Sequence, residues 1–147
     1  MLQFLRRLLG RGNSPSGSGA DSERLAADWL RRERGLKIVT RNWRSPHDRR
    51  DEIDLVCRDG EALVFVEVKA RAAGALVPGY HAVDARKKRV LLRAAEAYLA
   101  RLRVRPRTVR LDVVEVTLPS AEAAAKGARP EVLHFENVAL FGKEFRG

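Results

Sequence analysis

The feature of this sequence that most constrains its fold is a pair of apolar runs separated by a tight turn. Residues 52–58 and 62–70 are rich in Val, Ile, Leu and Phe, and Asp59-Gly60 stands between them. An Asp-Gly pair between two such runs is typical of a β-hairpin. Residues 63–66 are continuously apolar, which favours a strand buried on both faces. The chain is therefore expected to build a sheet that helices cover on both sides.

The segments around the hairpin extend this sheet. Residues 36–43 and 108–117 have the composition of strands, and a short closing strand is expected over 132–135. Apolar residues recur at helical spacing over 22–34 and 84–103. Strands joined by short turns pair antiparallel, whereas a helical crossover brings the next strand in parallel. We therefore expect an α/β fold with a mixed central sheet flanked by helices.

The composition of the N-terminal segment predicts an extension outside the folded domain. Residues 10–20 are mostly Gly and Ser, which is typical of a flexible linker. We therefore predict a flexible extension over residues 1–20 and a single domain over residues 21–147. A chain of 147 residues is long enough for one hydrophobic core.

The chain is expected to act in the cytoplasm. Cys57 is the only cysteine, so it cannot form an internal disulfide, and a reducing compartment is the default. No stretch reaches the roughly 18 apolar residues that a membrane-spanning helix needs. The sequence therefore predicts no membrane partner.

The balance of charge favours a polyanionic partner. The formal net charge is +10, and residues 86–110 contain ten basic residues and a single acid, Glu96. A solvated helix usually mixes both signs, so this segment is expected to contact the phosphates of nucleic acid. An arginine excess that serves solubility, or reflects genome composition, is the alternative. Trp43, which precedes Arg44, is expected to pack in the core, with stacking on an unpaired base as the alternative.

Two acids and a lysine are candidates for chemistry. Glu67 and Lys69 share one face of their predicted strand, because side chains at i and i+2 point the same way. Asp54 lies across the hairpin, and pairing about Asp59-Gly60 brings it close to residues 65–67. Carboxylates in this arrangement suit Mg²⁺ or Mn²⁺. A Glu-x-Lys tripeptide is more often a solvated ion pair, but an acid within an apolar run is costly unless it is paired or binds a metal.

Two helical residues are placed to join this site. Glu23 lies on the same helical face as Ala26 and Leu30, although an acid in the first turn is also favourable against the helix dipole. Lys87 extends the inward stripe of the second long helix. It is expected to reach a phosphate near the metal, with an ordinary solvent-facing lysine as the alternative.

Taken together, these residues make the sequence similar to the UPF0102 (YraN-like) family, within the PD-(D/E)xK nuclease superfamily. The resemblance runs from about residue 22 to residue 137. The matching positions are Glu23, Ala26, Ala27, Leu30, residues 41–44, 52–55 and 64–71, Lys87, Ala95, Tyr98, Leu99 and residues 110–114. The chain departs from the family pattern at Ser22 and Asp51, where the family usually has Gly, and at Lys88, where Gln is frequent.

The resemblance implies a three-layer, restriction-endonuclease-like fold and kinship with archaeal Holliday-junction resolvases. It implies that Asp54 and Glu67 hold the metal and that Lys69 is the catalytic lysine. Glu23 would complete the site, and Lys87 would be an accessory basic residue. The basic residues expected to bind nucleic acid are Arg44, Arg71, Arg86, Lys88, Arg89 and Arg93. A homodimer is implied as well, because junction-cleaving relatives are dimers.

The role of Asp112, which also matches a family position, is open between catalysis and structure. Three functions remain open for the whole chain. The first is a metal-dependent endonuclease that hydrolyses phosphodiester bonds of DNA, including branched, Holliday-junction-like DNA. The second is a non-catalytic nucleic-acid-binding module with a nuclease-like fold, and the third is a protein-interaction domain whose basic helix docks an acidic partner. The presence of Asp54, Glu67 and Lys69 together favours the enzyme.

Overall fold

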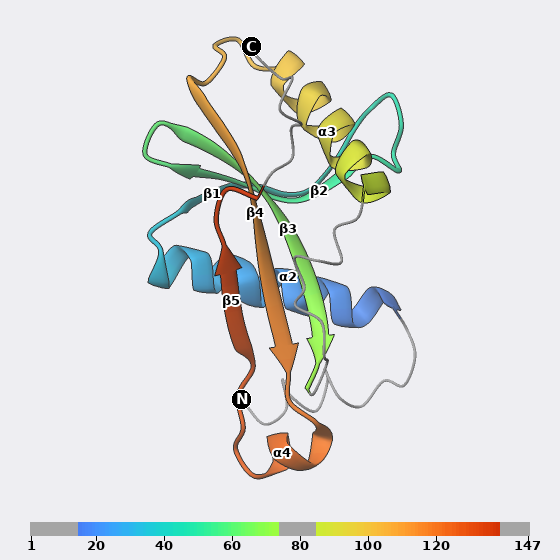
Figure 1. Cartoon of the computed structure of the whole chain (residues 1–147), viewed down its shortest axis with the longest axis vertical. Helices are drawn as coiled ribbons and strands as arrows, with labels where there is room; N and C mark the ends of the chain where they lie inside the picture. The colour runs from blue at the N-terminus through green and yellow to red at the C-terminus, as the bar shows by residue number, and fades with distance from the viewer. Residues whose placement is uncertain (1–14, 74–84, 139–147) are drawn as a thin grey trace.

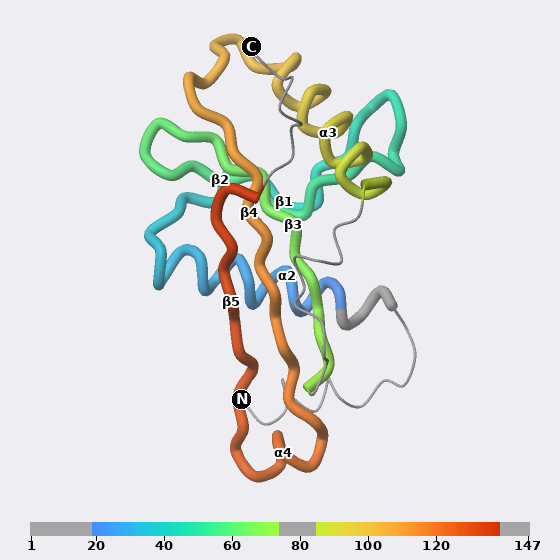
Figure 2. Tube along the Cα trace, viewed as in Figure 1, coloured from blue at the N-terminus to red at the C-terminus, as the bar shows by residue number. Residues whose placement is uncertain are grey.

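A five-stranded sheet forms the centre of the structure, a computed structural model that describes residues 15–73 and 85–138. The strands lie in the order β1-β2-β3-β4-β5. Their bounds are β1 Lys37–Arg44, β2 Glu52–Asp59, β3 Ala62–Ala72, β4 Thr108–Leu118 and β5 Glu131–Phe135. All neighbours pair antiparallel except β3 and β4, which are parallel and run side by side in Figure 2. The expected antiparallel hairpin, helical crossover and mixed sheet are confirmed.

Helices cover both faces of this sheet. Helix α2 (Pro15–Glu33) packs on one face, in a cluster with residues of β2, β3 and β4. Helix α3 (Ala85–Ala100) buries Leu91, Ala94 and Ala95 against the other face. In Figure 1, α2 crosses behind β3, β4 and β5, and α3 lies at the upper right. The arrangement is an α/β fold of three layers, as the sequence predicts.

Strand β3 separates the two apolar clusters. Leu63 and Phe65 belong to the cluster under α3, whereas Val64 and Val66 belong to the cluster under α2. All four side chains are buried. This alternation is the period of two of a β-strand, and it explains why the run is apolar without a break: both faces are covered.

Two glycines end elements where a left-handed backbone is required. Gly35 has φ +66° and follows α2, where the N–H groups of Arg34 and Leu36 both donate to the carbonyl of Leu30. Gly60 has φ +57° in the β2–β3 hairpin. Because Asp59 pairs with Ala62, the turn lies one residue later than the predicted Asp59-Gly60.

The start of α2 differs from the prediction. The helix begins at Pro15, so residues 15–20 are helical and are not the linker that their composition predicts. Proline is well tolerated in the first helical turn, because its fixed φ suits a helix and its missing N–H is not needed there. Residues 1–14, the rest of the predicted extension, lie outside the described residues, as does the part of the loop from residue 74 to residue 84.

A short helix, α4 (Ala121–Ala125), lies in the segment 119–130 that the sequence suggests is only a connection. Its N-cap is Ser120, whose hydroxyl accepts a hydrogen bond from the N–H of Ala123 at 3.1 Å. The cap and the alanine run explain the helix. None of the helices in the described ranges combines the length and hydropathy of a membrane span.

Candidate metal centre

Asp54 lies at a break in the regular alternation of β2. Ile53 packs in the cluster under α3 and Leu55 in the cluster under α2, although residues two apart on a regular strand share a face. On the neighbouring strand, Asn42 has φ +50°, a left-handed conformation that is uncommon outside glycine. The irregular backbone around Asp54 allows groups from both helical layers to act on one carboxylate.

The carboxylate of Asp54 also occupies the end of the β2–β3 ladder. The two strands pair from Asp59 and Ala62 to Leu55 and Val66. Beyond that pair, Oδ2 of Asp54 accepts a hydrogen bond from the backbone N–H of Val68 at 2.8 Å. The side chain of Asp54 therefore accepts a backbone hydrogen bond from β3. This bond holds Asp54 next to Glu67, the residue before Val68.

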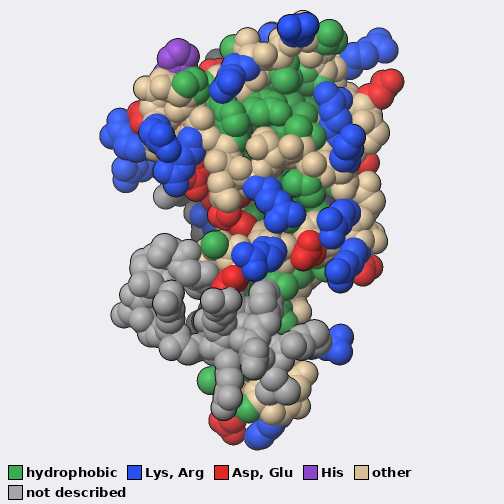
Figure 3. All heavy atoms as spheres, turned by 180° about the vertical axis from the view of Figure 1, so that it is seen from behind, with side chains coloured by type: hydrophobic (Ala, Val, Ile, Leu, Met, Phe, Trp, Pro, Cys, Tyr) green, Lys and Arg blue, Asp and Glu red, His purple; other side chains and the backbone are tan. Residues whose placement is uncertain are grey.

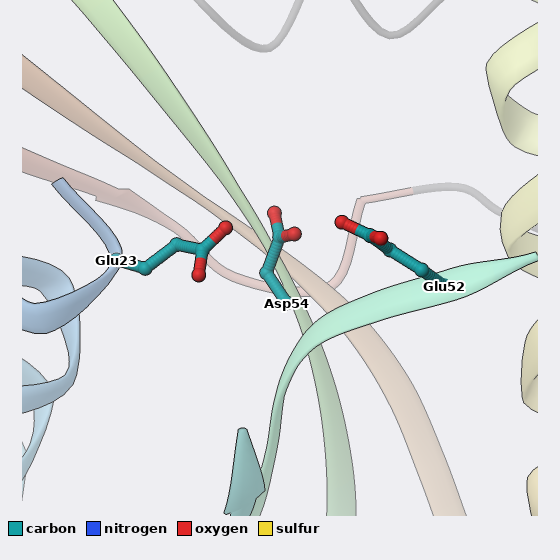
Figure 4. A group of neighbouring side chains, drawn as sticks. All are labelled: Glu23, Glu52 and Asp54. Atoms are coloured by element: carbon teal, nitrogen blue, oxygen red, sulfur yellow. The ribbon is translucent and has the colours of Figure 1, made fainter. Parts of the chain in front are cut away.

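Two further carboxylates surround Asp54. Figure 4 shows Glu23 reaching from α2 and Glu52 from β2, with Asp54 between them. One oxygen from each of the three residues lies within 4.8 Å of the others, a spacing compatible with a shared cation. Glu23 thus joins the site as the resemblance implies. The sequence prediction missed Glu52, although its position two residues before Asp54 on the same strand is a usable signal.

Glu67 provides a fourth carboxylate, with only 3% of its surface exposed. Its Oε1 forms ion pairs with Nζ of Lys69 at 3.1 Å and with Nζ of Lys87 at 3.4 Å. Its Oε2 is buried and has no hydrogen-bond partner. Lys87 therefore faces the site from α3, and the solvent-facing alternative for it is wrong.

Burial and the neighbouring carboxylates disfavour the ionised forms of Asp54 and Glu23. Burial and then the charge of Glu67 raise the pKa of Asp54 from 3.8 to about 8, although the Val68 N–H and Lys87 act in the opposite direction. Burial also raises the pKa of Glu23, against hydrogen bonds with Asp54 and Asn42. At neutral pH the metal-free site therefore favours the protonated form of Asp54.

A divalent cation fits these residues. Buried carboxylate oxygens are stable when they are hydrogen-bonded or bind a metal, and Oε2 of Glu67 is neither paired nor exposed. The donor set is entirely oxygen, which suits Mg²⁺ or Mn²⁺ better than softer metals. Glu23, Glu52 and Asp54 are the residues whose oxygens lie close enough together to share such an ion, and Glu67 adds its negative charge beside Asp54.

The basic residues predicted to bind nucleic acid lie on several elements. Arg44 pairs with Glu52 at 3.0 Å, and Arg71 of β3 pairs with Glu115 at 3.7 Å. Arg93 of α3 makes a bidentate contact with Asp51, at 2.9 and 3.2 Å. The others, at the start of α3, are half-buried or exposed: Arg86, Lys88 and Arg89. In Figure 3, Lys and Arg side chains are spread around an area of hydrophobic side chains and do not form a single track.

Two expectations about the basic segment and its neighbours need correction. Arg110 does not belong to a phosphate-tracking surface, because it donates to Asp112 and Asp59 and its side chain is only 15% exposed. Trp43 packs edge-on against Tyr98 of α3, with ring centroids 5.3 Å apart. This contact confirms core packing for Trp43.

The hydrogen bonds of Asp112 within the described part of the chain favour a structural role over a catalytic one. It is fully buried and accepts hydrogen bonds from Arg110, from His134 at 2.8 Å and from the N–H of Asn137 at 3.0 Å. Burial raises the pKa of Asp112, but the hydrogen bonds from His134, Arg110 and Asn137 together outweigh burial and leave the pKa below its ordinary value. The carboxylate is saturated with donors that tie β4 to β5, which explains its presence without catalysis.

Comparison with known proteins gives a consistent family. Residues 22–116 match the family described as "Uncharacterised protein family UPF0102". A UPF0102 protein of Beutenbergia cavernae is 48% identical over 106 residues, covering 72% of this chain and 86% of that protein. A UPF0102 protein of Anaeromyxobacter dehalogenans is 41% identical over 126 residues, covering 86% of each chain. A third, from Geobacter metallireducens, is 39% identical and covers 81% of this chain and 88% of its own length. The matched span contains every residue of the candidate metal centre, and the chain belongs to the uncharacterised protein family UPF0102.

Proposed function

We propose that this protein is a metal-dependent endonuclease that hydrolyses phosphodiester bonds in DNA. The observation that carries the proposal is the buried Asp54, raised in pKa and surrounded by three more carboxylates, beside an unpaired oxygen of Glu67. An acidic site of this kind is stable when a divalent cation completes it. The basic surroundings then favour a polyanionic substrate over a small neutral one.

In this proposal Asp54 and Glu67 hold Mg²⁺ or Mn²⁺, and Glu23 and Glu52 adjoin it. A bound ion supplies a water of lowered pKa and neutralises charge on the scissile phosphate. The side chains determine where that phosphate sits. Asp54 is fixed by the Val68 N–H and Glu67 by two lysines, so both carboxylates are oriented before substrate arrives.

Lys69 is the proposed catalytic lysine. Its Nζ contacts Glu67, and 26% of its side chain is exposed, so the ammonium group can face both the acids and a phosphate from solvent. There it would orient the attacking water and stabilise charge that develops on the phosphate oxygens. Lys87, with 34% of its side chain exposed, would contact a neighbouring phosphate from the side of α3.

The wider assignment is a proposal of the same kind. The order Asp54 on β2, then Glu67-Val68-Lys69 on β3, with Glu23 on the preceding helix, supports membership of the PD-(D/E)xK nucleases and a restriction-endonuclease-like fold. We propose branched DNA as a substrate and a homodimer as the active form, since two sites could then act on one junction. The proposed setting is the cytoplasm, which suits the free Cys57.

The test is a cleavage assay with Mg²⁺ or Mn²⁺ on branched, single-stranded and duplex DNA. Asp54→Asn, Glu67→Gln and Lys69→Met should each lower the cleavage rate by about 100-fold or more, while the proteins stay folded. Lys126→Met is the matched control for Lys69, because Lys126 is an exposed lysine that pairs with Glu122 in α4. Cleavage that survives all three changes would overturn the proposal. Salt-sensitive DNA binding without any product would favour the non-catalytic module.

A further inference from the structure

A groove of about 570 Å³ lies between the end of α2 and β1, outside the residues predicted to bind nucleic acid. Three cationic residues line it, and no acid does: Arg31 on α2, and Lys37 and Arg41 on β1. Gly35 and Thr40 also line it. Lys37 pairs with Arg58 and Arg41 with Leu55, so the two side chains lie on opposite faces of this edge strand. A surface with one sign of charge concentrates anions.

The cations of this groove are available to a ligand. Arg31 contacts Asp28 at 3.3 Å, but both side chains are exposed, and a pair of this kind contributes little. Lys37 and Arg41 are exposed and enter no ion pair with another described residue. Basic side chains without a local function in stability are the ones expected to serve a phosphate ligand.

The groove begins beside the candidate metal centre. Arg41 pairs with Leu55, the residue that follows Asp54 on β2. Arg41 also precedes Asn42, whose side chain hydrogen-bonds to Glu23. The same two elements, α2 and β1, therefore carry residues of both places. Glu23 and Asn42 lie at the candidate metal centre, and Arg31, Lys37 and Arg41 lie at the groove.

The distance from the acids to the groove can be estimated along α2. Arg31, which lines the groove, lies eight residues beyond Glu23 in the sequence, which corresponds to roughly 12 Å along a helix axis. Successive nucleotides of one strand of a duplex rise about 3.4 Å each, so this distance spans roughly three or four nucleotides. Strand β1 is also an edge of the sheet, so backbone groups on its outer side add donors for phosphate oxygens.

We propose that this groove binds the phosphates of the substrate strand over the three or four nucleotides on one side of the cleaved bond. The proposal rests on the proposed function for the position of cleavage, but the binding of a nucleic-acid strand does not depend on it. Lys37 and Arg41 are the residues that contact phosphates directly. Arg31 contributes at the end distant from the acids.

The test uses the full chain and a fluorescently labelled single-stranded oligonucleotide, in buffer without divalent cations so that no cleavage occurs. Fluorescence anisotropy gives the affinity of wild type and of Lys37→Ala/Arg41→Ala as a function of salt. The double variant should bind about 10-fold or more weakly. The slope of log K against log salt should fall by about 1.4, which is roughly 0.7 for each phosphate of a single strand that the variant no longer neutralises.

The matched control is Lys126→Ala/Arg129→Ala, which removes two exposed cations from the α4 connection. It should keep nearly all of the affinity and the slope. Lys37→Ala alone, at the exposed first residue of β1, should show about half of the change in slope and guards against a folding defect in the double variant. Unchanged oligonucleotide affinity in the groove variants, or an equal loss of affinity in the control, would overturn the proposal that the groove binds phosphates.

The two proposals fail in different ways. If wild type cleaves no DNA while the groove variants still lose affinity for the oligonucleotide, phosphate binding in the groove is supported and the nuclease proposal is wrong. If wild type cleaves, and the groove variants bind and cleave as wild type does, the nuclease proposal stands and the groove falls.

Discussion

Asp54 combines two properties that oppose each other in a protein without metal. It is 7% exposed, and the charge of Glu67 adds to the cost of ionising it. Its position is nevertheless fixed by the hydrogen bond from Val68. A carboxyl group held in place and disfavoured as an anion is prepared for a cation, because metal binding removes both the desolvation cost and the repulsion.

The raised pKa makes the stability of the metal-free protein depend on pH. The pKa of Asp54 is 3.8 in the reference state and about 8 in the folded chain, so the folded state binds the proton more tightly than the unfolded state. Its stabilising contribution is complete below pH 4 and is lost as the pH rises toward 8. Asp54→Asn should therefore raise the free energy of unfolding at pH 8, on the order of a few kcal/mol, and change it little at pH 4.

Thermal or urea unfolding in EDTA at the two pH values measures this difference. Addition of Mn²⁺ should stabilise wild type at pH 8 more than at pH 5, because the ion competes with the proton for Asp54. Equal effects of Asp54→Asn at both pH values would contradict the assigned cause.

Most of the site residues are visible in the sequence, and their geometry is not. Glu67 and Lys69 follow from the period of a strand, and the ion pair between them agrees with it. The sequence predicts a regular strand at Asp54, but the alternation breaks there, and Asn42 on the neighbouring strand has a left-handed backbone. Glu52 was missed because an acid at the start of a strand is ordinary until its neighbours are placed in space.

At the scale of elements, α3 is held to the sheet by apolar packing and by one polar clamp. Leu91, Ala94 and Ala95 fill the cluster above β2 and β3. Arg93 then reaches Asp51, in the turn before β2, through two hydrogen bonds. Asp51 is buried, and this arginine neutralises its negative charge near the site. The clamp fixes the distance between α3, which carries Lys87, and the strand that carries Asp54.

Breaking the clamp should reveal a coupling between the two residues. Asp51→Ala should destabilise the protein by about 1 kcal/mol, because it removes a buried acceptor. Arg93→Ala should also destabilise it, because the buried carboxylate of Asp51 then loses its partner. The double variant should lose less than the sum of the two. Urea unfolding of all four proteins measures the coupling, and strictly additive losses would show that the contact does not contribute.

The elements themselves were largely predictable. Apolar periodicity located β1 to β5 and α3 because each buries one or two faces against the same core. It failed at Pro15 and at α4, where the residues are small or polar and local capping decides the structure. Such segments carry little hydrophobic signal, so composition points to a linker even where a helix forms.

Across the whole molecule, two of the polar centres of the described sheet have different tasks. One is the acidic site around Asp54, which is destabilised by its own charge. The other is Asp112, which is satisfied by Arg110, His134 and Asn137 and so holds β4, β5 and the hairpin end together. Both lie in the span that matches the family, and the sequence alone could not separate them because the difference lies in their partners.

Substitution should separate the two centres. Asp112→Ala removes the acceptor shared by Arg110, His134 and Asn137 and should cost on the order of 3 kcal/mol of stability. In the folded fraction at low temperature, the affinity for Mn²⁺ should stay within about 2-fold of wild type, because no candidate ligand is changed. Glu67→Gln should behave in the opposite way, with little loss of stability and a large loss of Mn²⁺ affinity. Calorimetric titration with Mn²⁺ beside urea unfolding checks both, and a loss of Mn²⁺ affinity in folded Asp112→Ala would contradict the division.

The proposed nuclease activity requires that Asp54 and Glu67 hold one divalent ion. Anomalous diffraction from a crystal soaked in Mn²⁺ locates such an ion. We predict a single strong peak within about 2.0–2.3 Å of a carboxylate oxygen of each residue, reduced to background in Glu67→Gln. A peak bound elsewhere, or none between these two carboxylates at a Mn²⁺ concentration that supports cleavage, would contradict it.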